Sequence, residues 1–345
     1  MSALRLKDLA HRLESAERRA RHLKRLLSLS QVLTTDATKS DWPKCVPNKV
    51  VAAANCTWAA FFVAGREVDR YYLYQRQTER SHLTIRPSGF TRAAAAEAWD
   101  ANEPRLTDGG AFGLSRELCW YLPIRAHSRV LGGLVLPQAC LPTDRCGDGI
   151  ELLTLLSHQV SLAAELWKLH SDLVIAATFD RMTGALNRNA WLERVERRLT
   201  AVKEERIRGG IILFDLDNFK DINDNLGHAR GDKYLVEAAQ AAQSTLREED
   251  LFCRFGGDEF VIWLEGMSPT VLNGVVERLM YKVSSIASLY QGKLPNGAPH
   301  LGVSVGVVHV EADSCLELDA LLECVDSALY GAKAAGRGTW RMANC

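Results

Sequence analysis

The strongest constraint on the fold comes from two apolar runs that a tight turn joins. The runs are LFCRF (251–255) and EFVIWLE (259–265), and the turn between them holds Gly256 and Gly257. A glycine-containing turn between apolar runs predicts an antiparallel β-hairpin. Because Asp258 and Glu259 follow the glycines, the hairpin presents two acidic side chains where its second strand begins.

A second apolar strand also carries acidic residues. GGIILFDLD (209–217) places Asp215 and Asp217 where the apolar run ends. Buried strands hold little charge unless it is paired or binds a cation. If this strand is a neighbour of the hairpin, Asp215, Asp258 and Glu259 converge as the hard oxygen ligands that Mg²⁺ prefers. Each cluster taken alone is also compatible with a helix cap or a plain exposed turn.

The rest of segment 179–345 alternates helical and strand patterns. We expect helices over 268–288 and 316–336 and a strand over 300–311. Segment 41–150 differs, because its strand patterns follow one another closely. Its expected elements are strands at 58–65 and 70–75, two strands within 117–137, and a helix at 91–103. This pattern predicts an α+β domain with an antiparallel sheet.

Two further segments, 1–40 and 151–178, carry hydrophobic residues seven positions apart. Such spacing is typical of helices that pack against a partner helix. A lone helix packed on its own domain is an equal alternative for segment 1–40. Segment 151–178 ends where the last domain begins, which makes it a natural coupler of the two domains. The rows are Leu6, Leu13, Ala20 and Leu27 with Leu9, Ala16, Leu23 and Ser30, then Leu152, Gln159, Leu166 and Leu173 with Leu155, Leu162, Leu169 and Ala176.

Composition excludes several classes of protein. The 42 basic and 42 acidic residues cancel, so nothing predicts a nucleic-acid partner or an anionic membrane surface. No apolar run approaches the roughly 18 residues that a membrane span needs, and the charged N-terminus is unlike a signal peptide. The nine cysteines form no CxxC pair, which argues against structural zinc. We therefore expect a cytoplasmic protein without a membrane span.

The sequence GGDEF at 256–260 is the signature of the diguanylate cyclase, or GGDEF, domain. The resemblance extends over about 178–345, because further motifs follow in the order of the family. Met182, Ala185 and Leu186 depart from its usual Leu, Leu and Pro. The matching segments are DRMTGALNR (180–188), FDLDNFKDINDNLGHARGD (214–232), SVGVV (304–308) and ALYGAKAAGRG (328–338). The resemblance implies a fold like the palm of nucleotidyl cyclases and polymerases.

The resemblance also implies catalytic roles. Asp215 and Asp258 would bind Mg²⁺, or Mn²⁺ in its place, with the Leu216 carbonyl oxygen assisting. Glu259 would act as a metal ligand or as the general base. The 3′-hydroxyl of one GTP would attack the α-phosphate of another, and a second such step would close cyclic di-GMP. Each domain resembles half of an active site, so the resemblance implies a homodimer whose contacts the heptad rows could supply.

Other matching residues would bind the substrate. Asn223 and Asp232 would hydrogen-bond the guanine edge, which offers both donors and acceptors. His228 lies near the nucleotide in the family, and a structural role for it is an equal alternative. Lys220, Lys333 and Arg337 would contact the triphosphate as charge clamps, and Phe219, Gly256 and Gly257 would line the phosphate path through backbone groups.

The pattern RxxD precedes the hairpin turn. Arg247 lies nine residues before Gly256, and Asp250 follows it by three. At this offset the pattern resembles the family's inhibitory site for its product, which implies allosteric product inhibition. An Arg fork can bind phosphate and guanine, and an Asp can accept from guanine N–H groups. A solvated ion pair is the alternative.

Segment 41–177 resembles a GAF domain, a regulatory ligand-binding module, on the pattern YLPIRAHSRVLGGLVL (121–136) followed by a helix. The whole chain is thus expected to join a GAF-like sensor to a GGDEF domain through a long helix. The ligand of the sensor is not identified, and Cys119 or His127 could be structural or could hold a cofactor. A receptor for cyclic di-GMP without catalysis, and a sensor for which GTP is only an effector, are the other functional hypotheses. Candidate pocket residues are Trp58, Phe61, Phe62, Tyr72 and Trp120, although most of them would equally fit an ordinary core.

Overall fold

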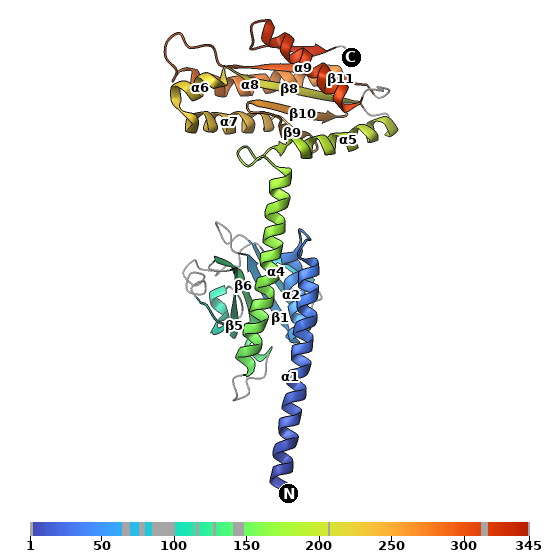
Figure 1. The fold of residues 1–345 in the computed structure, drawn as a ribbon, viewed down its shortest axis with the longest axis vertical. Helices are drawn as coiled ribbons and strands as arrows, with labels where there is room; N and C mark the ends of the chain where they lie inside the picture. The colour runs from blue at the N-terminus through green and yellow to red at the C-terminus, as the bar shows by residue number, and fades with distance from the viewer. Residues whose placement is uncertain are drawn as a thin grey trace. The chain divides into compact units, whose positions relative to one another are not determined.

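The computed structural model describes residues 3–63, 70–75, 80–84, 101–112, 114, 117–126, 129–140, 148–205, 208–311 and 317–343. The chain divides into two compact units, Met1–Leu173 and Val174–Cys345 (Figure 1). No helix in the described part of the chain is both long enough and apolar enough to cross a membrane.

The first unit contains a six-stranded sheet in the order β3-β2-β1-β6-β5-β4. All its neighbouring strands are antiparallel, as the sequence predicts. Two of its strands, β3 and β4, were not predicted, and residues 91–100 of the expected helix lie outside the described residues. The strands are β1 (Trp58–Val63), β2 (Arg70–Gln75), β3 (Arg80–Thr84), β4 (Arg105–Asp108), β5 (Leu118–Ala126) and β6 (Arg129–Pro137).

Three helices pack on one face of this sheet: α1 (Ala3–Asp36), α2 (Trp42–Ala54) and α4 (Asp148–Thr178). Side chains alternate along β1, so that Phe61 faces the helices and Phe62 the opposite side. Trp42 anchors the packing, since it is fully buried and donates its indole N–H to the Leu33 carbonyl oxygen at 2.9 Å. The larger of the two hydrophobic cores of this unit therefore lies between the sheet and the three helices.

Among the described side chains of the predicted α1 heptad rows, Ser30 is half-buried and the others are exposed, namely Leu9, Leu13, Ala16, Ala20, Leu23 and Leu27. Leu13 and Leu27 are each 64% exposed. Leu29 and Leu33, which are not in the rows, are buried in the core with α2. The α1 rows are therefore available to a partner and are not used within the unit.

The rows of α4 are only partly available. Leu152, expected to face a partner helix, is buried in the core of the first unit. That part of the prediction is wrong, because the first turns of α4 pack on the sheet. Farther along the helix, Leu162, Leu166, Leu169 and Leu173 are 51%, 42%, 54% and 68% exposed. The exposed seam, Leu162–Leu166–Leu169–Leu173, therefore occupies the C-terminal half of α4.

The second unit is built on a sheet of order β12-β11-β8-β10-β9-β7. The predicted hairpin is confirmed as β9 and β10, and β8 pairs antiparallel with both β10 and β11. Its strands are β7 (Leu186–Asn187), β8 (Gly209–Asp217), β9 (Leu251–Arg254), β10 (Glu259–Glu265), β11 (Gly302–Val310) and β12 (Trp340–Ala343). Its helices are α5 (Arg188–Glu205), α6 (Phe219–Leu226), α7 (His228–Gln243), α8 (Pro269–Gln291) and α9 (Leu318–Ala334).

The two faces of β8 carry different residues because side chains alternate along a strand. Phe214 and Leu216 join the core under α7 and α8. Leu213 joins the core under α5 and α9. Asp215 and Asp217 follow Leu213 at intervals of two, so β8 carries both acids on its α9 side.

Candidate active site

The pairing of β8 with β10 brings three acidic residues to one end of the sheet. Glu259 lies directly opposite Asp215 in the register. The Leu216 N–H donates to the Asp258 carbonyl oxygen at 3.2 Å, which fixes the end of the turn beside β8. The predicted neighbourhood of the two strands is therefore confirmed.

These carboxylates share an unfavourable electrostatic environment. Burial and the nearby charge of Asp215 raise the pKa of both Asp258 and Glu259. Lys333 of α9 compensates in part, because its Nζ lies 2.8 Å from Asp215 Oδ2. A bound cation would relieve the remaining repulsion. Among the described residues, no three His, Cys, Asp or Glu side chains are already grouped as metal ligands.

The Gly256–Gly257 turn is closed by its own backbone. The N–H groups of Phe255 and Gly256 both donate to the Glu259 carbonyl oxygen, at 2.8 and 3.2 Å. A Cβ at Gly256 would lie 2.8 Å from Glu259 Oε2, so only glycine leaves this carboxylate in place. A Cβ at Gly257 would meet no described atom within 4 Å, which leaves room for a ligand to approach.

Arg254 anchors this turn. Its Nε and Nη2 donate to the Gly257 carbonyl oxygen at 3.1 and 2.7 Å, and its Nη1 lies 3.3 Å from Asp180 Oδ2. Although burial opposes the shift, hydrogen bonds from Thr183 and the charge of Arg254 lower the pKa of Asp180. The sequence did not predict this contact. The sequence features that could have indicated this contact are the Asp-x-x-Thr spacing of Asp180 and Thr183 and the position of Arg254 just before the turn.

Asp217 supports a turn after α9. Only 1% exposed, it accepts hydrogen bonds from Ser304 Oγ at 2.7 Å and from the Gly338 N–H at 3.0 Å. Burial raises its pKa against these two bonds. Arg337 precedes Gly338 with a left-handed φ of 66°, which is uncommon for a residue with a Cβ. Asp217 thus holds the backbone conformation that presents Arg337.

The predicted guanine-binding residues belong to α6 and α7. Asn223 is half-buried, and its side chain lies against Gly231, where a Cβ would come within 1.8 Å of Asn223 Oδ1. Asp232 and His228 are exposed on α7. Gly231 was missed from sequence, because its contact with Asn223 depends on how the two helices pack.

Two further predicted residues lie on α6. Lys220 is exposed on its first turn. Phe219 is half-buried and stacks on Tyr234, with 6.1 Å between the ring centroids. This stacking fixes the start of α6 directly after β8. The helix therefore begins close to the strand end that carries Asp215.

The RxxD residues form a small turn of their own. The Arg247 backbone N–H donates to Asp250 Oδ2 at 2.8 Å, and the Arg247 side chain is exposed. Asp250 Oδ1 is buried and finds no hydrogen-bond partner among the described residues. Burial raises the pKa of Asp250. The turn thus leaves one guanidinium in solvent and one acceptor oxygen unused.

The aromatic candidates of the first unit do not share one pocket. Phe62 packs with Phe112 and Tyr121 on the far side of the sheet, whereas Phe61 faces the helices. Trp58 lies against the Phe62 cluster, and Tyr72 and Trp120 belong to the core on the helix side. Burial raises the pKa of the Cys119 thiol to about 12, which disfavours a thiolate ligand. His127 lies outside the described residues.

The part of the chain that carries this site is similar to known proteins. Residues 177–339 match the model of the family described as "Diguanylate cyclase, GGDEF domain". Diguanylate cyclase DgcS of Shewanella oneidensis is 29% identical over 245 residues, which cover 70% of this chain and 76% of that protein. Diguanylate cyclase DgcM of Escherichia coli K12 is 33% identical over 199 residues, which cover 57% of this chain and 44% of that protein.

The diguanylate cyclase SiaD from Pseudomonas aeruginosa, solved with its activator SiaC, is 31% identical with a TM-score of 0.44. The match covers 52% of this chain and 66% of that one. The chain therefore spans about three quarters of one curated relative and less than half of the other.

Proposed function

We propose that this chain, which carries a GGDEF domain of the diguanylate cyclase family over residues 177–339, joins two GTP molecules into cyclic di-GMP. The observation that carries the proposal is the convergence of Asp215, Asp258 and Glu259 at the paired ends of β8 and β10. The 3′-hydroxyl of one GTP attacks the α-phosphate of the other and pyrophosphate leaves. A second, equivalent step closes the ring and releases a second pyrophosphate.

The donor set fits a hard divalent cation. Carboxylate oxygens of Asp215, Asp258 and Glu259, with the Leu216 carbonyl oxygen, would hold Mg²⁺ or Mn²⁺. The raised pKa values of Asp258 and Glu259 support this assignment, because burial and the nearby charge of Asp215 both disfavour the ionised carboxylates and a bound cation would favour them. Such an ion supplies neutralisation of charge on the transferred phosphoryl group. As the alternative to holding the ion, Glu259 would take the proton from the attacking hydroxyl as a general base.

The nucleotide is oriented by residues around this centre. Asn223 and Asp232 bind the guanine edge, which would exclude adenine because mispaired polar groups would stay unsatisfied. His228 lies in the same helical region, at the start of α7. The position of Asn223 against Gly231 supports this role, because the missing side chain at Gly231 leaves room for the Asn223 amide.

The triphosphate is bound by positive charge and by backbone. Lys220, Lys333 and Arg337 supply positive charge. With a metal ion held by Asp215, Lys333 would leave its ion pair with that carboxylate and bind phosphate instead. The first-turn N–H groups of α6, beginning at Phe219, suit phosphate because a helix N-terminus attracts anions. The open space over Gly257 allows phosphate to approach the turn.

A complete reaction requires two such domains face to face, which implies a homodimer. The exposed leucines of α1 and the seam Leu162–Leu166–Leu169–Leu173 are surfaces that a second copy could cover. The rows repeat at heptad spacing, which suits a parallel coiled coil. Dimerisation through α4 would set the distance between the two GTP sites.

Inhibition by the product and regulation by the first unit are also part of the proposed function. Cyclic di-GMP binds at Arg247 and Asp250, where the Arg247 guanidinium is exposed. Asp250 Oδ2 already accepts from the Arg247 N–H, and the buried Oδ1 has to become accessible before it can accept from guanine. The first unit acts as a GAF-like regulatory domain, supported by its antiparallel sheet with helices on one face. A cytoplasmic location remains a prediction that suits a GTP-consuming enzyme.

Turnover of GTP tests this proposal. Product-free protein with GTP and Mg²⁺ should yield cyclic di-GMP and pyrophosphate in a ratio of one to two, at a specific rate that rises with protein concentration. Asp258→Asn should abolish the product. Asp319→Asn, at an exposed acid of α9, is the matched control and should remain active. The absence of cyclic di-GMP at every protein concentration would refute the proposed function.

A further inference from the structure

The first unit contains a cavity beneath the last turns of α4 that belong to it. Its volume is about 410 Å³, within the range of roughly 300–1,000 Å³ that is usual for small-molecule sites. It opens between α4 and the ends of β1, β5 and β6. All its lining residues belong to the first unit, so it is separate from the proposed cyclase site.

The wall of this α4 cavity is aromatic and apolar. Trp42 stacks on Trp167, with 5.9 Å between ring centroids and 20° between planes, and meets Phe61 edge to face at 5.8 Å. Aliphatic side chains supply most of the remaining wall, among them Val130 and Leu131 of β6. Flat rings surrounded by aliphatic groups favour a flat, apolar ligand.

The formal charges of the described residues that line the α4 cavity cancel. Arg129 and Lys168 supply two positive groups, and Glu165 and Asp172 supply two negative ones. Lys168 Nζ is already paired with Asp172 Oδ1 at 2.9 Å. A ligand with a net charge would lose hydration in the apolar interior, and the described residues around it carry no net charge that would compensate this loss. The balance therefore favours an uncharged ligand.

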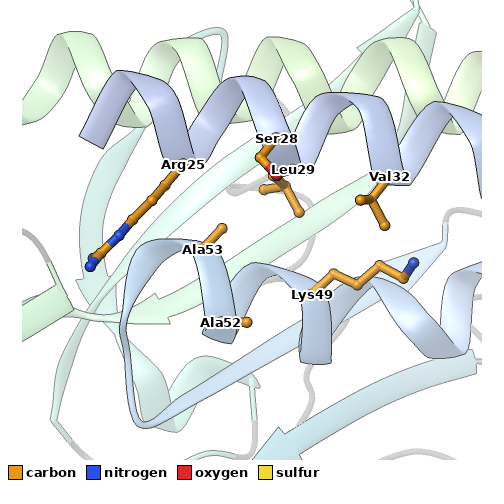
Figure 2. Close-up of a pocket in the computed structure, with 7 residues that line it drawn as sticks. All are labelled: Arg25, Ser28, Leu29, Val32, Lys49, Ala52 and Ala53. Carbon is orange, nitrogen blue, oxygen red and sulfur yellow. The ribbon is translucent and has the colours of Figure 1, made fainter. Parts of the chain in front are cut away.

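A second hollow in the same unit is lined by different kinds of residue. Figure 2 shows it between α1 and α2, with Val32 on one helix and Ala52 and Lys49 on the other. It measures about 310 Å³ and has no aromatic residue in its wall. Lys49, which lines it, is ion-paired with Asp36. This hollow supplies a comparison site for the α4 cavity.

We propose that the α4 cavity is a binding site for a small, uncharged aromatic molecule. The ligand lies against the half-buried Trp167 ring, which the fully buried Trp42 supports by stacking, and contacts the turn of α4 that carries Leu169. Leu169 lines the cavity and also belongs to the exposed seam. The site thus includes the part of α4 that the seam uses, and its existence does not depend on the proposed cyclase activity.

Calorimetric titration of the full chain at pH 7 tests the site with three naphthalene probes of similar size. These are neutral 2-naphthol, anionic 2-naphthoate and cationic 2-naphthylmethylamine. We expect 2-naphthol to bind saturably with one molecule per chain, and each charged probe to bind at least tenfold more weakly. No saturable binding of 2-naphthol, or equal affinity for a charged probe, would overturn the proposal.

Matched variants locate the binding. Ala126→Phe fills the α4 cavity and should weaken 2-naphthol binding at least tenfold, whereas Ala52→Phe fills the hollow of Figure 2 and should leave it unchanged. If Ala126→Phe does not fold, Leu169→Gln places a polar group in the wall at a position 54% exposed and should weaken binding. Wild-type affinity in the folded cavity variant, or a loss caused by Ala52→Phe, would contradict the assignment.

Discussion

Asp180 Oδ2 lies 3.3 Å from Arg254 Nη1, and the same guanidinium donates two hydrogen bonds to the Gly257 carbonyl oxygen. Asp180 is the second residue after α4 ends at Thr178. One side chain therefore joins the segment that follows α4 to the turn that carries Asp258. A displacement of this segment would therefore move the turn directly, through the Arg254 side chain.

Arg254→Lys tests whether this contact positions the turn. Lysine keeps the charge but cannot donate to Asp180 and Gly257 together, since it lacks the planar fork. We expect the rate of cyclic di-GMP synthesis to fall about tenfold and the free energy of unfolding to fall by about 1–2 kcal/mol. Urea unfolding and steady-state kinetics measure the two effects.

The control for this variant is Arg198→Lys. Arg198 Nη1 pairs with Glu265 Oε2 at 2.7 Å, at the end of β10 away from the turn. It should lose stability without the tenfold loss of rate. Equal kinetic losses in the two variants would contradict a positioning role for Arg254.

The carboxylate of Asp258 is expected to destabilise the metal-free protein at neutral pH. Burial and Asp215 raise its pKa in the folded state, so the folded state binds this proton more tightly than the unfolded state. The stability of the wild type should therefore rise as the pH falls from 7 through the raised pKa. Asp258→Asn should unfold at a higher urea concentration than wild type at pH 7, and this difference should shrink at lower pH. A less stable variant at pH 7 would show that the repulsion is absent.

Gly231→Ala should impair recognition of GTP. The added methyl group would come within 1.8 Å of Asn223 Oδ1, so the amide must move from its present place. We expect KM for GTP to rise about tenfold, since a lost hydrogen bond in a buried site costs roughly 1–2 kcal/mol. Gly274→Ala is the control, because a Cβ there meets no described atom within 4 Å on helix α8. Identical KM values for the two variants would remove Asn223 from the guanine site.

Arg247→Ala should relieve inhibition by product. The Arg247 backbone N–H, rather than its side chain, makes the hydrogen bond to Asp250, so the turn should survive the substitution. The concentration of cyclic di-GMP that halves the rate should rise at least tenfold, with the uninhibited rate unchanged. Inhibition curves with added product measure this. An unaltered curve would place the inhibitory site elsewhere.

Much of this site could be predicted from sequence because its chemistry lies at strand ends. Asp215 lies near the end of one apolar strand, and Glu259 begins another. A charged side chain at such a position needs a partner. The separate task of Asp217 could not be predicted, since its partners Ser304 and Gly338 are 87 and 121 residues away. Gly231 was missed because its contact with Asn223 depends on how α6 and α7 pack.

The helical segments show a different limit. The heptad rows of α4 predicted an exposed seam correctly at Leu173 but wrongly at Leu152. A heptad pattern identifies an apolar face and does not say whether a helix buries that face in its own domain or in a partner. Short elements such as β4 carry too few residues for a period to be recognised.

The central claim is that Asp215 and Asp258 hold the same divalent ion, and a double-mutant cycle tests it most directly. Mn²⁺ affinity is measured by electron paramagnetic resonance with a non-hydrolysable GTP analogue for wild type, Asp215→Asn, Asp258→Asn and the double variant. We predict that each single substitution weakens Mn²⁺ binding at least tenfold. We also predict that the Mn²⁺ affinity of the double variant equals that of the single variant with the lower affinity. Losses that simply add, as they do for independent positions, would contradict a shared ion.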